Sequence, residues 1–218
     1  MAQLFRPAAT TAFRLAILAA IIGVLALFAG SYLYLRSDWF WRVGESAAQP
    51  IPFSHELHVS GIGVACAFCH STAERFAHAG MPSAQTCLTC HSQILQGATV
   101  LEPLRTSAAL RQPVQWSSVH RLPSFVYFHH GAHVSRGITC ETCHGRVDQM
   151  RETRKVHTLS MGWCLDCHRN PDMHIGSTDF GSKLSQMDAP SDPPVGKSSL
   201  FVSKVFASPL TDCSVCHR

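Results

Sequence analysis

The hydrophobic residues of this chain form one long uninterrupted run near the N-terminus and no long periodic segment after it. The run from Leu15 to Leu35 contains no charged residue over 21 positions. An apolar segment of this length predicts a helix over about 13–36 that is long enough to cross a lipid bilayer. Beyond it the hydrophobic pattern is poor, so we expect short helices and loops with little sheet.

The residues around the apolar run predict its orientation. Arg6 and Arg14 precede it without any acidic residue, which places the N-terminus in the cytoplasm by the positive-inside rule. A cleaved signal peptide is the alternative, but Leu27 and Phe28 stand where cleavage needs small residues. The prediction is a single-pass anchor in the cytoplasmic (inner) membrane, with the remaining chain on the periplasmic, outer face. Aromatic residues of the kind that form interfacial belts crowd the other end: Tyr32, Tyr34, Trp39, Phe40 and Trp41.

Composition changes the expectation for the rest of the chain. Only 15% of its residues are charged, yet it contains ten cysteines and fourteen histidines. This balance predicts that a metal or cofactor organises the fold in place of a large apolar core. The net charge of +4 comes from basic residues that are scattered along the chain, so we exclude nucleic-acid binding as a function class.

All ten cysteines lie in five CxxCH motifs, which we number one to five in chain order. Two thiols three residues apart bond the two vinyl groups of one haem, and the next histidine ligates its iron. Zinc ribbons and disulfides do not require that histidine, and a thioredoxin-like site uses one cysteine pair. The motifs end at His70, His91, His144, His168 and His217.

We therefore predict five covalently attached haem c groups, with those five histidines as proximal iron ligands. The predicted fold class is a multihaem cytochrome c, with short helices and loops organised by five haems and one N-terminal transmembrane helix. The predicted thioether sites are Cys66, Cys69, Cys87, Cys90, Cys140, Cys143, Cys164, Cys167, Cys213 and Cys216.

An internal repeat predicts second axial ligands for four haems. Residues 53–60, FSHELHVS, match residues 128–135, FHHGAHVS, and each copy precedes two CxxCH motifs. In the first copy Ser54 occupies the position of His129, so we expect His129 to lie near the haems without ligating iron. Histidines at i and i+3 share one side of a helical turn and are expected to reach different irons. The histidines present in both copies are His55 and His58, and His130 and His133.

The duplication divides the chain into five segments. They are the anchor (1–44), a first dihaem module (45–98), a linker (99–127) with a helix around 100–111, a second dihaem module (128–174), and a wrapping loop with the fifth haem (175–218).

The pattern F-x-H-x-x-H ahead of CxxCH resembles that of the small class III multihaem cytochromes c. In that family the first histidine ligates the haem of the next motif, and the second ligates a later haem. The resemblance implies that His55 and His58 serve motifs one and two. It implies equally that His130 and His133 serve motifs three and four, although the pairing within each set could be swapped.

The fifth haem has no partner from the repeat. His120, in the string WSSVHRLPSF before the second module, is the first candidate for its distal ligand, followed by Met161 and His157. Methionine ligation would raise the potential of that haem relative to two histidines. The remaining residues considered are Met150, Met173, His78 and His174.

A wider resemblance covers almost the whole chain. The anchor and the strings AGMPSAQTCLTCH, PVQWSSVHRLPSFVYFHHGAHV, CETCHG, MGWCLDCHR and DCSVCHR are similar to the pentahaem cytochrome c subunit of alternative complex III, a bacterial quinol:electron-acceptor oxidoreductase. One departure is His129, which replaces an asparagine of that pattern. The resemblance implies membrane subunits and an iron–sulfur subunit as partners, and a periplasmic cytochrome c or an oxidase as acceptor.

Haems whose two axial positions are filled by protein exchange single electrons and bind no substrate. The sequence therefore predicts an electron conduit without catalytic residues of its own. The alternative is a stand-alone membrane-anchored quinol dehydrogenase, with a weakly ligated haem close to Trp39–Trp41. A multihaem enzyme such as a nitrite reductase would need a vacant iron beside an acid/base group, for which the sequence contains no clear signal.

Overall fold

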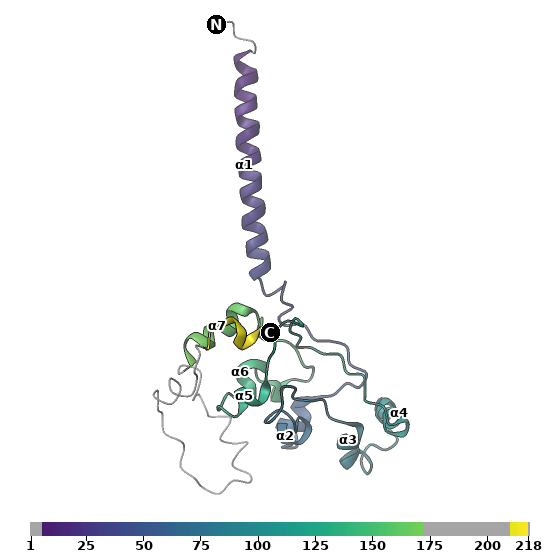
Figure 1. Cartoon of the computed structure of the whole chain (residues 1–218). Helices are drawn as coiled ribbons and strands as arrows, with labels where there is room; N and C mark the ends of the chain where they lie inside the picture. The colour runs from purple at the N-terminus through teal and green to yellow at the C-terminus, as the bar shows by residue number, and fades with distance from the viewer. Residues whose placement is uncertain (1–5, 172–209, 218) are drawn as a thin grey trace. The chain divides into compact units, whose positions relative to one another are not determined.

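The computed structural model describes residues 6–171 and 210–217. They belong to two compact units that divide between Val43 and Gly44. The first unit contains one long helix, and the second contains short helices joined by irregular segments (Figure 1). Because the chain from Gly44 onward forms one unit, the two predicted dihaem modules are parts of one compact body.

Helix α1 (Pro7–Arg36) forms the first unit together with the turn that follows it. It begins at Pro7 rather than near residue 13, because proline at the first helical position has the backbone angle of a helix and lacks an N–H that would stay unpaired there. Its span Ala8–Arg36 has a mean hydropathy of 2.5, so it is long and apolar enough to cross a membrane. These properties are shared by membrane anchors and N-terminal signal sequences.

The second unit is built from short helices, as the sequence predicts. The only β pairing in its described part consists of two isolated bridges, Ser46–Arg154 and Val126–His217. The helices are η1 (Glu56–Gly61), α2 (Cys66–Cys69), α3 (Ala84–His91), η2 (Thr99–Leu101), α4 (Glu102–Leu110), α5 (His130–Val134), α6 (Cys140–His144), η3 (Val147–Gln149), α7 (Met161–Arg169) and α10 (Cys213–Cys216).

The helix predicted around residues 100–111 is confirmed as η2 followed by α4. It ends where Arg111 adopts a left-handed conformation with φ of 54°, two residues before Pro113. Its buried side pairs with α3 to make a small apolar cluster. That cluster consists of Ile51, Ala84, Leu101 and Leu104.

This cluster is small for a body of this length, and many large apolar side chains near the CxxCH motifs remain exposed. Six of them are between 51% and 62% exposed: Phe68, Phe76, Met81, Leu95, Phe125 and Tyr127. Apolar surface on this scale marks a site that binds an apolar partner. The described chain therefore does not build its own interior from apolar side chains alone.

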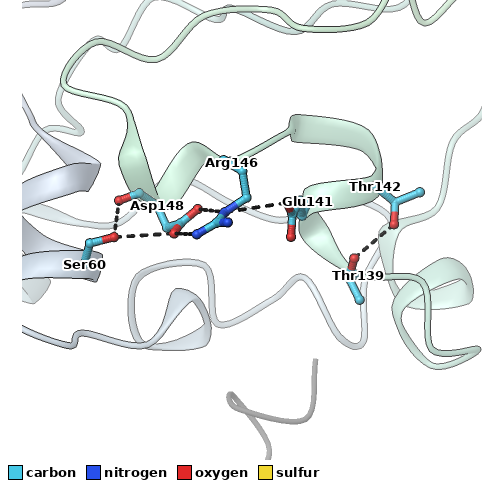
Figure 2. Close-up of polar contacts among 6 residues, drawn as sticks. All are labelled: Ser60, Thr139, Glu141, Thr142, Arg146 and Asp148. Carbon is cyan, nitrogen blue, oxygen red and sulfur yellow. Dashed lines mark hydrogen bonds and ion pairs between the residues drawn. The ribbon is translucent and has the colours of Figure 1, made fainter. Parts of the chain in front are cut away.

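Polar contacts attach η1 to the residues that follow motif three (Figure 2). The Ser60 hydroxyl donates to the backbone carbonyl of Asp148 at 2.7 Å. Arg146 donates to both carboxylate oxygens of Asp148, at 3.0 and 2.8 Å, and lies 3.5 Å from Glu141. Asp148 is only 8% exposed, and the Arg146 guanidinium holds the pKa of its carboxyl below the usual range.

Candidate multihaem site

Each CxxCH motif lies on a short helix. In α2, α6 and α10 the first cysteine is the first helical residue. Helices α3 and α7 begin three residues earlier, because the Ser83 and Ser160 hydroxyls accept the N–H groups of Thr86 and Trp163 as N-terminal caps. Cysteines at i and i+3 then lie on one side of a helical turn, and all ten are free thiols.

Three repeat histidines lie opposite three motif histidines. The ring centroids of His58 and His91 are 6.2 Å apart, at an interplanar angle of 55°. Those of His130 and His144 are 6.4 Å apart and nearly parallel, at 7°. An iron between two imidazoles, with a bond of about 2 Å to each nitrogen, places their centroids about 6 Å apart.

The third pair has the same spacing. The centroids of His133 and His168 are 6.0 Å apart, at 39°. Motifs two, three and four therefore each have a repeat histidine at the separation that an intervening iron requires. The i, i+3 histidines His130 and His133 face different motifs.

Hydrogen bonds at Nδ1 orient most of these rings. A backbone carbonyl can only accept, so Nδ1 carries the proton and Nε2 keeps the lone pair that binds a metal. The donor–acceptor pairs are His58 with Ser54 (2.8 Å), His70 with Gly80 (2.8 Å), His130 with Ala77 (2.8 Å), His133 with His129 (2.9 Å), His168 with Leu210 (2.8 Å) and His217 with Phe125 (3.2 Å).

His55 is held by a side chain instead of a carbonyl. Its Nδ1 is 3.0 Å from the Thr153 hydroxyl oxygen. Burial, followed by repulsion from His70 and His58, lowers the pKa of His55 to about 4. The ring is therefore neutral near pH 7, which is the form that binds a metal.

Aromatic contacts repeat in both modules. Phe53 stacks on His58 with centroids 4.3 Å apart, and Phe128 stacks on His133 at 4.5 Å. The same two phenylalanines meet the first histidine of each pair edge-on, at 4.9 and 4.7 Å. Both copies of the repeat therefore share a unit of one phenylalanine ring and two histidine rings, as well as a sequence pattern.

His129 has a structural task that the sequence comparison did not identify. Its Nδ1 accepts the N–H of Ala132 at 3.1 Å and caps α5. In the first module the Ser54 hydroxyl accepts the N–H of the equivalent Leu57, also at 3.1 Å. The clue in the sequence was that His129 aligns with serine, a common N-terminal cap.

The fifth motif packs against the segment that precedes the second module. Val126 and His217 form an antiparallel bridge, and Tyr127 N–H donates to the carbonyl of Cys216 at 2.8 Å. The Phe125 and His217 rings have centroids 5.8 Å apart. These contacts position motif five against the segment before the second module.

The candidate distal ligands of the fifth haem are distributed around other motifs. His120 contacts the ring of His144 edge-on at 4.4 Å, which is too short for an intervening iron, and its Nε2 is buried without a partner among the described residues. His157 stacks on Trp163 at 5.3 Å. Within the described residues, no ring contact joins His120 to His217. Of the remaining candidate ligands, Met161 is 62% exposed and Met150 is 7% exposed. His78 is also among the described residues, whereas Met173 and His174 lie outside them.

These features fit covalently bound haem. Each motif presents two free thiols on one helical turn, most ligand candidates keep Nε2 free, and exposed apolar side chains surround the motifs. Among the described residues, no group of three or more His, Cys, Asp or Glu side chains is arranged to hold a metal ion directly. When bound, haem supplies one-electron redox chemistry at its iron.

Comparison with known proteins supports this assignment at the level of class. No family model matches the chain. The chain is similar to the multihaem cytochrome c subunit of a menaquinone reductase from Nitratidesulfovibrio vulgaris, with 29% identity over 186 residues, 72% of this chain and 86% of the relative. The similarity supports a multihaem cytochrome c with covalently bound haem c.

Proposed function

We propose that this chain is a membrane-anchored pentahaem c-type cytochrome and the electron-transfer subunit of a quinol:electron-acceptor oxidoreductase of the alternative complex III type. It receives electrons from a quinol-oxidising partner and passes them to a periplasmic cytochrome c or an oxidase. The proposed partners are membrane subunits and an iron–sulfur subunit. The chain supplies no catalytic residue of its own.

The observation that carries the proposal is the set of opposed histidine pairs. The pairs His58–His91, His130–His144 and His133–His168 each have the separation that one iron requires. An iron held on both sides by imidazole has no open position for a substrate, so it exchanges electrons only. We propose the same ligation for His55 with His70, because His55 holds the position in the first copy of the repeat that His130 holds in the second.

His120 is the proposed distal ligand of the fifth haem. Its buried and unpartnered Nε2 supports a role as an iron ligand, because buried polar atoms nearly always have a partner. A His120→Ala variant is expected to convert one low-spin haem to a high-spin haem in low-temperature EPR. If all signals remain low-spin, His120 is not a ligand and Met161 becomes the residue to replace next.

The haem content and the anchor can be tested on one preparation from membranes. A pyridine haemochrome assay is expected to give five haems per chain, one for each CxxCH motif. Intact mass measurement is expected to find helix α1 retained in the mature chain. A count below five contradicts the pentahaem proposal, and a mass that lacks α1 shows a cleaved signal.

A second candidate function is electron delivery to a quinone. The related subunit belongs to a menaquinone reductase, so the direction of electron flow in this chain could be reversed. The purified complex is expected to reduce cytochrome c with a quinol as donor. Reduction of menaquinone by a reduced cytochrome, without the quinol-dependent activity, would favour the second candidate. Recovery of this chain alone with quinol oxidation intact would favour a stand-alone quinol dehydrogenase.

A further inference from the structure

The two dihaem modules contact each other through equivalent backbone positions. The N–H of Glu56 donates to the carbonyl of Met150 at 3.0 Å, and the N–H of Gly131 donates to the carbonyl of Phe76 at 3.1 Å. Glu56 and Gly131 each follow the first repeat histidine of their module, and Met150 and Phe76 each lie six residues after a motif histidine. The same hydrogen bond is therefore made once in each direction.

The first repeat histidine of each module is also held by the other module. His130 donates from Nδ1 to the carbonyl of Ala77, which follows motif one. His55 is hydrogen-bonded through Nδ1 to Thr153, which follows motif three. Each module thus orients an axial ligand candidate of its counterpart.

The contacts between the modules are reciprocal. The segment after motif one pairs with the start of α5 in the second module, and the segment after motif three pairs with the residues at the first repeat histidine of the first module. Reciprocal contact between equivalent residues is the property of a two-fold relation, in which each half presents the same surface to the other. Gly131 marks how closely the backbones approach, because a Cβ there would lie 2.8 Å from the carbonyl carbon of Arg75.

We propose that an approximate internal two-fold relates the two dihaem modules, and that motifs one and three form the electron junction between them. The inference rests on the proposed function, because it assumes a haem at each motif. The segments that directly follow motifs one and three make these contacts with the other module, so sites one and three are the neighbours across the two modules.

The junction orders the five sites. His55 and His58 lie one helical turn apart, which makes sites one and two neighbours, and His130 and His133 do the same for sites three and four. The carbonyl of Leu210, three residues before motif five, holds His168 of motif four. His120, the proposed ligand of the fifth iron, also lies against His144 of site three. The electron path therefore runs from site two through sites one and three to site five, with site four beside sites three and five.

This order differs from the order of the motifs in the sequence, and it makes sites two and five the ends of the path. Each transfer moves one electron, with one iron oxidised from ferrous to ferric and its neighbour reduced. The donor and acceptor are therefore expected to meet the protein at the motifs that end in His91 and His217.

The structural test uses the full chain in its purified complex, with its haems attached. A cryo-electron microscopy map of this complex gives the iron–iron distances directly. The shortest distance between the modules is expected to join the irons ligated by His70 and His144. If any other pair across the modules is closer, the junction is wrong. A haem count below five in the same sample contradicts the pentahaem function, whereas five haems with another junction contradict only this inference.

A second test concerns the hydrogen bond by which Thr153 of the second module orients His55 of the first. Replacing Thr153 with valine removes its hydrogen bond to His55 and is expected to shift the g-values of one low-spin EPR signal. Thr153→Ser is expected to restore that signal, and Thr106→Val, on the exposed side of α4, is the matched control that leaves all signals in place. If Thr153→Val also leaves every signal unchanged, a residue of the second module does not orient this ligand.

Discussion

At the residue scale, His129 and Ser54 show that equivalent positions can do the same work with different side chains. Both accept a backbone N–H three residues ahead. Both also offer a backbone carbonyl to the Nδ1 of the second repeat histidine, His58 in one module and His133 in the other. His129, although it lies beside two ligand candidates, therefore stabilises the local backbone and orients His133.

This role predicts different effects for two substitutions of His129. His129→Ser is expected to leave stability unchanged, because serine caps the equivalent turn of the first module. His129→Ala is expected to lower the free energy of unfolding by about 1 kcal/mol, the usual effect of losing an N-terminal cap. Denaturant unfolding measures the difference, and the EPR spectrum should stay low-spin in both variants. A new high-spin signal in either would show that His129 ligates iron.

Asp148 predicts a pH-dependent contribution to stability. Its pKa in the folded protein lies below the usual value of about 3.9, so the folded state favours the ionised form. The stabilisation is therefore present above that pH and is lost as the pH falls through the folded pKa. Asp148→Asn should destabilise the protein at pH 7, and the difference from the unmodified protein should shrink below about pH 4.

Ser60→Ala probes the same carboxylate from its other neighbour. The Ser60 hydroxyl donates to the Asp148 carbonyl at 2.7 Å and to its carboxylate at 3.4 Å, and the second bond helps to lower the pKa of Asp148. Its loss is expected to cost about 1 kcal/mol at pH 7 and less below about pH 4, measured by the same denaturant unfolding. A pH-independent effect of Asp148→Asn would contradict the role of the ionised carboxylate.

At the element scale, short helices present the ligand candidates, and contacts between modules decide where these helices lie. Helix α5 has only five residues, and an isolated helix of that length is not stable in water. Its N-terminal residues are instead paired to the backbone after motif one, through Phe76 and Ala77. The close approach at Gly131 is part of this pairing.

Gly131→Ala is therefore expected to separate α5 from that backbone. The added methyl group would lie 2.8 Å from the Arg75 carbonyl carbon and 2.9 Å from the Glu74 carbonyl oxygen. Overpacking of this kind destabilises by about 2 kcal/mol, and the EPR signal of the haem held by His130 should change. Gly97→Ala is the control, because no atom lies within 4 Å of a Cβ at that position. Equal effects of the two variants would show that the approach at Gly131 is not tight.

At the scale of the whole molecule, the C-terminal motif contributes to a haem site other than its own. Leu210 accepts the Nδ1 proton of His168, while His217 is held by Phe125 from before the second module. The end of the chain therefore links the fourth and fifth sites. Leu210 and His168 are 42 residues apart in the sequence.

Deleting residues 210–218 is therefore expected to affect two haems. The haem count should fall from five to four, and the EPR signal of the fourth haem should shift, because His168 loses its carbonyl partner. A Cys213→Ala/Cys216→Ala variant should also contain four haems but should keep the fourth signal, since Leu210 remains. Pyridine haemochrome assays and EPR measure both quantities. An identical fourth signal in the two variants would contradict the role of Leu210.

The short helices and the apolar N-terminal segment could be predicted from the sequence because each depends on local spacing, and the five haem sites are a prediction of the same kind. A thioether site needs two cysteines three residues apart and the next histidine, and a membrane-length helix needs one uncharged run. The helix around residues 100–111 follows from local pattern in the same way. The start of α1 at Pro7 was missed because hydropathy does not report the conformational preference of a helix start.

The supports of the ligand candidates were decided by tertiary structure. The contacts of Thr153 with His55, Ala77 with His130 and Phe76 with Gly131 each join residues far apart in the chain. No periodicity encodes such contacts, because they depend on how two folded modules meet. The sequence alone predicted that haem binds and at which motifs it is attached. The fold decided which sites are neighbours, because that follows from packing between modules and not from the order of the motifs.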